Sequence, residues 1–145
     1  MGNNRTTPYG MWRYGNDFRK AARAVLSHYD IAQFMPYYFL LGQSIELSLK
    51  AFLLGHGTPL KELRSKKYGH DLEALLNEAY RLGLEVKLDG THRAVIHLLG
   101  VEYLDRRFQY IRTGMLRLPE PRLAQAAADK LSDGLEKYFE RVTKL

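Results

Sequence analysis

The segment from Met35 to Gly55 constrains this chain most, because it is a helix-length run that is apolar on almost its whole circumference. Two stripes of apolar residues follow helical spacing: Tyr38, Leu41, Ile45, Leu49 and Phe52 on one, and Leu40, Leu47, Ala51 and Leu54 on the other. A helix that is apolar on nearly all sides is surrounded by other elements. We therefore predict a protein built around this central helix.

Amphipathic patterns on both sides of that segment predict the other helices. They cover residues 16–29, a short turn within 58–66, and longer runs over 70–84, 91–104 and 122–145. The resulting fold class is all-α, an up-and-down helical bundle of four to five main helices. An irregular loop over residues 106–121 precedes the last helix, since Thr-Gly and two prolines interrupt it.

The predicted boundaries rest on capping residues. Asn16 and Asp17 are expected to cap the first helix, and Thr58 the short turn. Residues 1–15 are then a loose N-terminal arm, and residues 16–145 a single domain. An apolar seam is expected along the last helix, formed by Leu123, Ala127, Leu131, Leu135, Tyr138, Val142 and Leu145. In the preceding helix, the expected core positions are Val95, Leu98, Leu99 and Leu104.

Two charged residues interrupt the apolar central helix. Glu46 and Lys50 are four positions apart with the glutamate first, the orientation that favours a helical ion pair. A buried charge must be paired and hydrogen-bonded, and His70 and Asp71 at the start of the next long helix are available as partners. We predict a structural polar cluster of Glu46, Lys50, His70 and Asp71. A ligand-binding or catalytic site built from the same residues is the alternative.

Several classes of site have no support in the sequence. The five histidines form no His-x-x-x-His pair, and His92 and His97 are five apart, so no metal site is predicted. Glycine-rich phosphate loops and the Gly-x-Ser-x-Gly motif are missing, and we expect no cofactor. No run reaches the roughly 20 apolar residues of a membrane span, and no signal peptide is recognisable. With zero cysteines, we expect a cytoplasmic protein and no membrane partner.

A basic segment follows the fourth long helix, in a chain whose formal net charge is +6. Aromatic residues, among them Tyr103 and Phe108, are interleaved with its arginines, and such a combination binds phosphates and stacks on unpaired bases. The predicted nucleic-acid-binding residues are Arg106, Arg107, Arg112, Arg117 and Tyr110. The alternative is a solvated basic surface whose aromatic side chains turn into the core.

The stretches "YYFLLGQSIELSLKAFLLGHG" and "YGHDLEALL", within residues 37–76, resemble the HEPN domain family. The similarity lies in an apolar helix bearing Glu46 and Lys50, followed by a helix that starts Gly-His-Asp-Leu. It implies a helical bundle that forms homodimers. It also implies RNA cleavage, RNA or nucleotide binding, a toxin–antitoxin role, or partnership with a nucleotidyltransferase or antitoxin protein.

Catalytic HEPN proteins carry an Arg-x(4–6)-His motif near the last helix, and this chain departs from that pattern. His97 is its last histidine, and it precedes every arginine of the basic segment. Matching spacings occur elsewhere, at Arg23 with His28 and at Arg64 with His70. We therefore predict a dimeric binding or interaction module. The alternatives are a metal-independent ribonuclease that uses Arg64 and His70 as an atypical catalytic pair, and a structural scaffold.

Overall fold

The computed structural model describes residues 6–28, 35–104 and 118–143. Those residues contain six helices and no strand, which confirms the predicted all-α bundle. The helices are α1 (Pro8–His28), α2 (Met35–Gly55), α3 (Leu60–Leu63), α4 (Leu72–Arg81), α5 (Gly90–Leu104) and α6 (Pro121–Thr143). Most of the loop predicted before the last helix, residues 106–117, lies outside the described residues.

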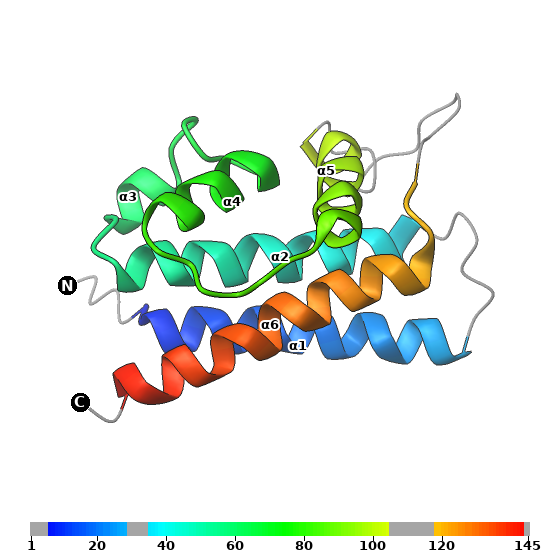
Figure 1. Cartoon of the computed structure of the whole chain (residues 1–145), viewed down its shortest axis with the longest axis horizontal. Helices are drawn as coiled ribbons and strands as arrows, with labels where there is room; N and C mark the ends of the chain where they lie inside the picture. The colour runs from blue at the N-terminus through cyan, green and yellow to red at the C-terminus, as the bar shows by residue number, and fades with distance from the viewer. Residues whose placement is uncertain (1–5, 29–34, 105–117, 144–145) are drawn as a thin grey trace.

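Helix α2 lies at the centre of the bundle. It contacts α1 and α6 on one side and α3, α4 and α5 on the other, and α5 also contacts α6 (Figure 1). Figure 1 shows α1, α2 and α6 lying lengthwise, whereas α5 stands across their direction. The side chains of Leu41, Ile45, Leu49 and Leu53 are almost completely buried. The prediction of a central helix that is apolar on nearly all sides is confirmed.

The N-terminal part of α1 differs from the prediction. The helix begins at Pro8 rather than after Asn16, and Thr7 Oγ1 accepts a hydrogen bond of 2.9 Å from the Gly10 N–H in the manner of an N-cap. Trp12 is buried, and its indole N–H donates to the Ser132 carbonyl of α6. The loose arm predicted over residues 1–15 is therefore wrong from Pro8 onwards. The first turns are held by the burial of one large aromatic side chain.

The remaining helix ends agree more closely with the predictions. Gly57 and Gly83 have positive φ values of 97° and 100°, which suit glycine best, and they follow the last turns of α2 and α4. Asp71 Oδ1 accepts from the Ala74 N–H at 3.0 Å and caps α4. Thr58 is not the cap of α3, because Pro59 occupies that position without a side-chain hydrogen bond.

The apolar seam of α6 is shifted from the predicted one. Ala127, Leu131 and Leu135 are buried as expected, but Leu123 is 45% exposed. Burial of Ala124, Ala128 and Phe139 places the buried face one residue further along the helix. Leu104 of α5 is also wrong as a core residue, since it is 49% exposed. Leu145 and the side chain of Val142 lie outside the described residues.

Within the described ranges, each helix is too short or too polar to cross a lipid bilayer.

Candidate functional site

The carboxylate of Glu46 is the centre of a buried polar cluster between α2, α4 and α5. Its Oε2 atom accepts a hydrogen bond of 2.8 Å from Lys50 Nζ, one turn further along α2. Its Oε1 atom accepts two more, from His70 Nδ1 and from the Tyr103 hydroxyl, each at 2.8 Å. Three donors from three parts of the chain therefore converge on one side chain. We call Glu46, Lys50, His70 and Tyr103 the Glu46 cluster.

Burial distinguishes this cluster from an ordinary surface ion pair. The side chains of Glu46 and Lys50 are only 7% and 12% exposed. A carboxylate loses its hydration when it is buried to this degree, and the loss is offset only if both oxygens find donors. Both oxygens of Glu46 have donors. The i, i+4 spacing in α2 supplies the nearest one, and the other two come from elements that fold back onto α2.

His70 reaches Glu46 from the turn that precedes α4. Gly69 has a φ of 45° within this turn, and Asp71 follows as the N-cap of α4. A carboxylate only accepts hydrogen bonds, so the imidazole carries its hydrogen on Nδ1. The side chain of His70 is 33% exposed. Of the four residues predicted to form the polar cluster, the structure brings three together, and Asp71 instead caps the adjacent helix.

Tyr103 is the member of the cluster that the sequence did not reveal. The sequence left open whether the aromatic residues near the basic segment stack on bases or turn into the core. The side chain of Tyr103 is buried and its ring stands edge-on to His70, so for this residue the core alternative holds. Burial is the main cause of its raised pKa, and the nearby Glu46 carboxylate adds to the effect. The phenol therefore stays protonated and donates to Glu46.

Gly42 makes room for that phenol. A Cβ atom at this position would overlap with Cδ1 and Cε1 of the Tyr103 ring. The glycine therefore lets the ring of α5 lie directly against the backbone of α2, with Glu46 one turn further along. A glycine inside an otherwise apolar helix is the sequence signal that could have indicated this close approach.

The cluster has the geometry of a structural network. The Glu46 carboxylate already accepts three hydrogen bonds, and the described residues contain no group of three or more His, Cys, Asp or Glu side chains that could hold a metal ion. The feature that remains open to a ligand is the imidazole of His70, whose Nε2 atom makes no hydrogen bond to the described part of the chain. An oriented imidazole can bind a ligand or move a proton.

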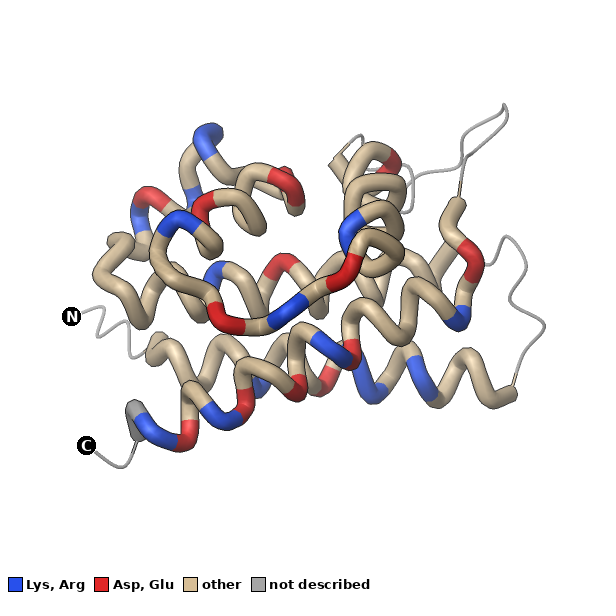
Figure 2. Tube along the Cα trace, viewed as in Figure 1, with Lys and Arg blue, Asp and Glu red and all other residues tan. Residues whose placement is uncertain are grey.

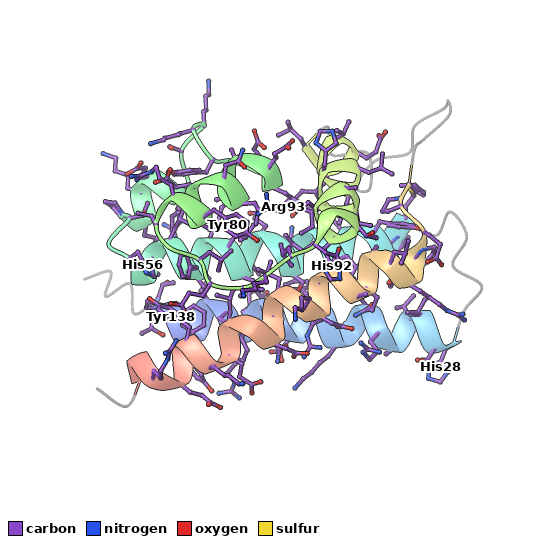
Figure 3. All side chains as sticks on the ribbon, in the orientation of Figure 1. His28, His56, Tyr80, His92, Arg93 and Tyr138 are labelled. Carbon is purple, nitrogen blue, oxygen red and sulfur yellow. The ribbon has the colours of Figure 1, made fainter. Side chains whose placement is uncertain are left out.

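The Arg–His spacings considered for catalysis are not brought together. Arg64 is exposed at the end of α3, and among the described residues it makes no side-chain hydrogen bond or ion pair. Arg23 forms an ion pair with Asp129 of α6. His28 is exposed at the end of α1 (Figure 3). Neither pair shows the mutual contact that would indicate a catalytic unit.

The other histidines are also engaged in local contacts. His92 lies in the first turn of α5, where its backbone N–H donates to Asp89 Oδ1 at 2.8 Å. His97 Nδ1 donates to Glu73 Oε2 at 2.7 Å, with both side chains more than half exposed. In the described residues these two histidines therefore make separate local contacts.

A second polar network joins α1 to α6, and sequence reasoning missed it. Asn16 Oδ1 accepts from Arg19 Nε at 2.8 Å and from the Ser132 hydroxyl at 3.0 Å. Arg19 also forms a 3.0 Å ion pair with Asp129, with both side chains about 15% exposed. Asn16 was predicted to be a helix cap but lies within α1. Its polarity serves contact between two helices that are distant in sequence.

The predicted RNA-binding residues Arg106, Arg107, Arg112, Arg117 and Tyr110 lie outside the described residues. Their role remains a prediction.

Comparison of the chain with family models, with curated proteins and with solved structures finds no match in any of the three. The resemblance to HEPN domains therefore rests on the sequence of residues 37–76 alone.

Proposed function

We propose that this chain is a HEPN-like binding and interaction module that does not itself cleave RNA. The observation that carries the proposal is the saturation of the Glu46 carboxylate by Lys50, His70 and Tyr103. In this arrangement the polar residues of "IELSLK" and "GHDL" tie α2, α4 and α5 together. The residues that resemble the HEPN signature are then used to build the bundle, and its surfaces are left for partners.

We expect the module to be a homodimer. Val101 and Leu104 on α5 and Leu123 on α6 are 50%, 49% and 45% exposed, and apolar side chains of this size favour burial between copies. Light scattering at micromolar concentration checks this expectation. A dimer gives about twice the 16.8 kDa chain mass, and a species that stays at the chain mass contradicts it.

RNA or nucleotide contact through the basic segment is part of the same proposal, as is partnership with a nucleotidyltransferase or a toxin–antitoxin protein. Phosphate contacts release counterions, so RNA affinity must fall as salt rises. The slope of log affinity against log salt concentration measures the number of phosphate contacts. Removing Arg112 and Arg117 should lower the size of this slope by roughly 0.7 per lost contact on single-stranded RNA. Substituting the exposed Arg13 and Lys20 of α1 is the matched control and should leave the slope unchanged.

A ribonuclease is the second candidate, favoured by one observation. The His70 side chain is one-third exposed and is oriented by a buried carboxylate, which is the arrangement of a general acid or base. An RNA-cleavage assay on purified protein decides between the candidates. We expect no cleavage by the wild type. Cleavage that His70→Ala abolishes and His97→Ala retains would replace the proposed module with an enzyme.

A further inference from the structure

A groove of about 1010 Å³ lies on the surface of the bundle. The end of α2, the stretch between α4 and α5, and the C-terminal half of α6 form its walls. Phe52, Leu84, Val86 and Leu135 lie in its lining, although each side chain is at most 8% exposed. A cavity of this size is large enough for a drug-sized ligand or a short peptide segment.

One end of the groove is a pair of stacked rings. His56 and Tyr138 have ring centroids 5.3 Å apart and an angle of 18° between their planes, and Figure 3 shows them side by side. His56 Nδ1 lies 2.9 Å from the Phe52 carbonyl and 3.2 Å from the Tyr138 hydroxyl. Because the carbonyl only accepts, Nδ1 carries the hydrogen. These contacts fix both rings in place, so the groove has a rigid aromatic end.

The rim of the groove carries more positive than negative side chains. Lys87, Lys130, Lys137 and Arg141 line it, against the two carboxylates of Glu85 and Glu140. Among the described residues, none of the four cations forms an ion pair. Figure 2 shows basic positions along α6 and on the stretch that crosses between α4 and α5.

The segregation of charge on α6 explains why these cations lack partners. Asp129 and Asp133 of the same helix are paired with Arg19 of α1, and of the two only Asp129 is largely buried. Lys130, Lys137 and Arg141 are spaced by seven and four residues and so share another face of the helix. Asp129 of α6 is therefore used in the contact with α1, whereas Lys130, Lys137 and Arg141 lie along the groove together with Glu140.

The wall between α4 and α5 is an extended chain with unused backbone groups. Leu84, Val86 and Leu88 are buried while Glu85 and Lys87 are exposed, which is the alternation of a β-strand. In the described structure, the backbone N–H groups of residues 85–88 donate no hydrogen bond to the protein. The Val86 carbonyl accepts from the Tyr80 hydroxyl at 3.0 Å.

Close packing holds this extended stretch against α6. A Cβ atom at Gly134 would lie 2.6 Å from Val86 Cγ2, so the glycine allows the stretch to approach the helix. Both its buried residues, Leu84 and Val86, and its exposed residues, Glu85 and Lys87, line the groove. The same four residues also line a second cavity beside Tyr80 and Arg93, so the stretch forms a wall between the two cavities.

We propose that this groove binds an extended acidic peptide segment of a partner protein. The segment adds a strand beside residues 85–88, places apolar side chains against the His56–Tyr138 rings, and directs carboxylates to the four cations of the rim. Backbone pairing supplies affinity in such complexes, and alternate side-chain pockets supply specificity. This inference rests on the proposed function as an interaction module and names the chemistry of its partner.

The test is fluorescence anisotropy with a labelled seven-residue peptide of alternating glutamate and valine. We expect micromolar binding by the wild-type chain, and no comparable binding of the matched lysine–valine peptide. A peptide with the same sequence but N-methylated at alternate residues cannot donate those backbone hydrogen bonds, and its affinity should fall at least about tenfold. No binding of the acidic peptide at millimolar protein, or equal binding of the methylated one, would overturn the proposal.

Variants locate the binding to the groove. The double variant Lys130→Gln with Lys137→Gln should lower the affinity for the acidic peptide about fivefold. The control double variant Lys20→Gln with Lys61→Gln should change that affinity less than about twofold. All four lysines are exposed, so the folded helix content seen by circular dichroism should match in the two double variants. Equal weakening in both would mean attraction to overall charge and would refute the groove.

The two proposals fail separately. RNA cleavage that depends on His70 overturns the non-nucleolytic module but leaves the peptide result standing. A chain that neither cleaves RNA nor binds the acidic peptide overturns the groove inference alone.

Discussion

The hydroxyl of Tyr103 donates a 2.8 Å hydrogen bond to the Glu46 carboxylate, although 57 positions separate the two residues in the chain. This bond joins α5 to the central helix at a point where both side chains are almost fully buried. Together with the His70 contact, it extends the local ion pair between Glu46 and Lys50 into a network that joins α2, α5 and the turn before α4. The stability of the bundle should therefore depend on Glu46 more than on any exposed acid.

Glu46→Ala should lower the free energy of unfolding by about 2–4 kcal/mol, because Lys50 and the Tyr103 hydroxyl would lose their buried acceptor. Glu73→Ala is the matched control, since Glu73 also pairs with a histidine 24 positions away but is 54% exposed. Its cost should stay below about 0.5 kcal/mol. Urea unfolding of the two variants measures both values, and equal costs would show that the Glu46 cluster is solvated.

Tyr103→Phe removes one donor to a charged acceptor and keeps the ring. We expect a loss of about 1.5–3 kcal/mol in the free energy of unfolding. Tyr14→Phe removes a hydroxyl from a tyrosine that is 60% exposed and should change stability by less than about 0.5 kcal/mol. Thermal and urea unfolding compare the two. A neutral Tyr103→Phe would mean that the Lys50 and His70 hydrogen bonds suffice for Glu46.

Gly42→Ala should destabilise the protein even though alanine favours helices over glycine. The added Cβ would overlap with the Tyr103 ring, and overpacking of this kind costs about 1–3 kcal/mol. Gly90→Ala at the start of α5 is the comparison, because nothing lies within 4 Å of a Cβ there. That substitution should be neutral or stabilising by up to about 1 kcal/mol. Differential scanning calorimetry measures the stability of both variants. If the Tyr103 ring can move aside, Gly42→Ala would be at least as stable as Gly90→Ala.

The protein should lose stability at alkaline pH through its buried tyrosines. Burial raises the pKa of Tyr38 to about 12, and it raises the pKa of Tyr37 and Tyr103 as well. The unfolded chain releases these protons from about pH 10, whereas the folded chain retains them. The stabilising contribution is therefore complete below about pH 10 and is lost as the pH rises towards the folded-state values.

Tyrosinate absorbance, followed together with helix content by circular dichroism, checks this prediction. Of the 10 tyrosines, the buried ones should ionise only as the helices unfold. A titration in which all tyrosines ionise near pH 10 with the helices intact would contradict it.

Much of the secondary structure was predictable from local pattern. The predicted span of α2, about Met35 to Gly55, agrees with its observed bounds, and glycines at positive φ follow the last turns of α2 and α4. Helical periodicity and glycine at positive φ act over a few residues, so a single sequence carries them. The pairing of Glu46 with Lys50 is local in the same sense, because four residues of helix place the two side chains on one face.

Burial was harder to predict wherever two helix faces were nearly equivalent. On α6, Leu123 is exposed while the smaller Ala124 is completely buried, and periodicity alone cannot choose between neighbouring positions. The early start of α1 depends on Trp12, which is buried only because α6 supplies the Ser132 carbonyl and the Phe139 ring beside it. Nothing within residues 8–15 specifies that partner.

The sequence by itself determined that the chain is a helical bundle, which helix is central, and that the central helix carries an ion pair. Tertiary structure alone decided that Tyr103 completes that pair, that Asn16 joins α1 to α6, and that an extended stretch borders a basic groove. The physical reason is the range of the interactions. Periodicity and capping act within a turn or two, whereas a hydrogen bond between distant residues exists only after the helices have packed.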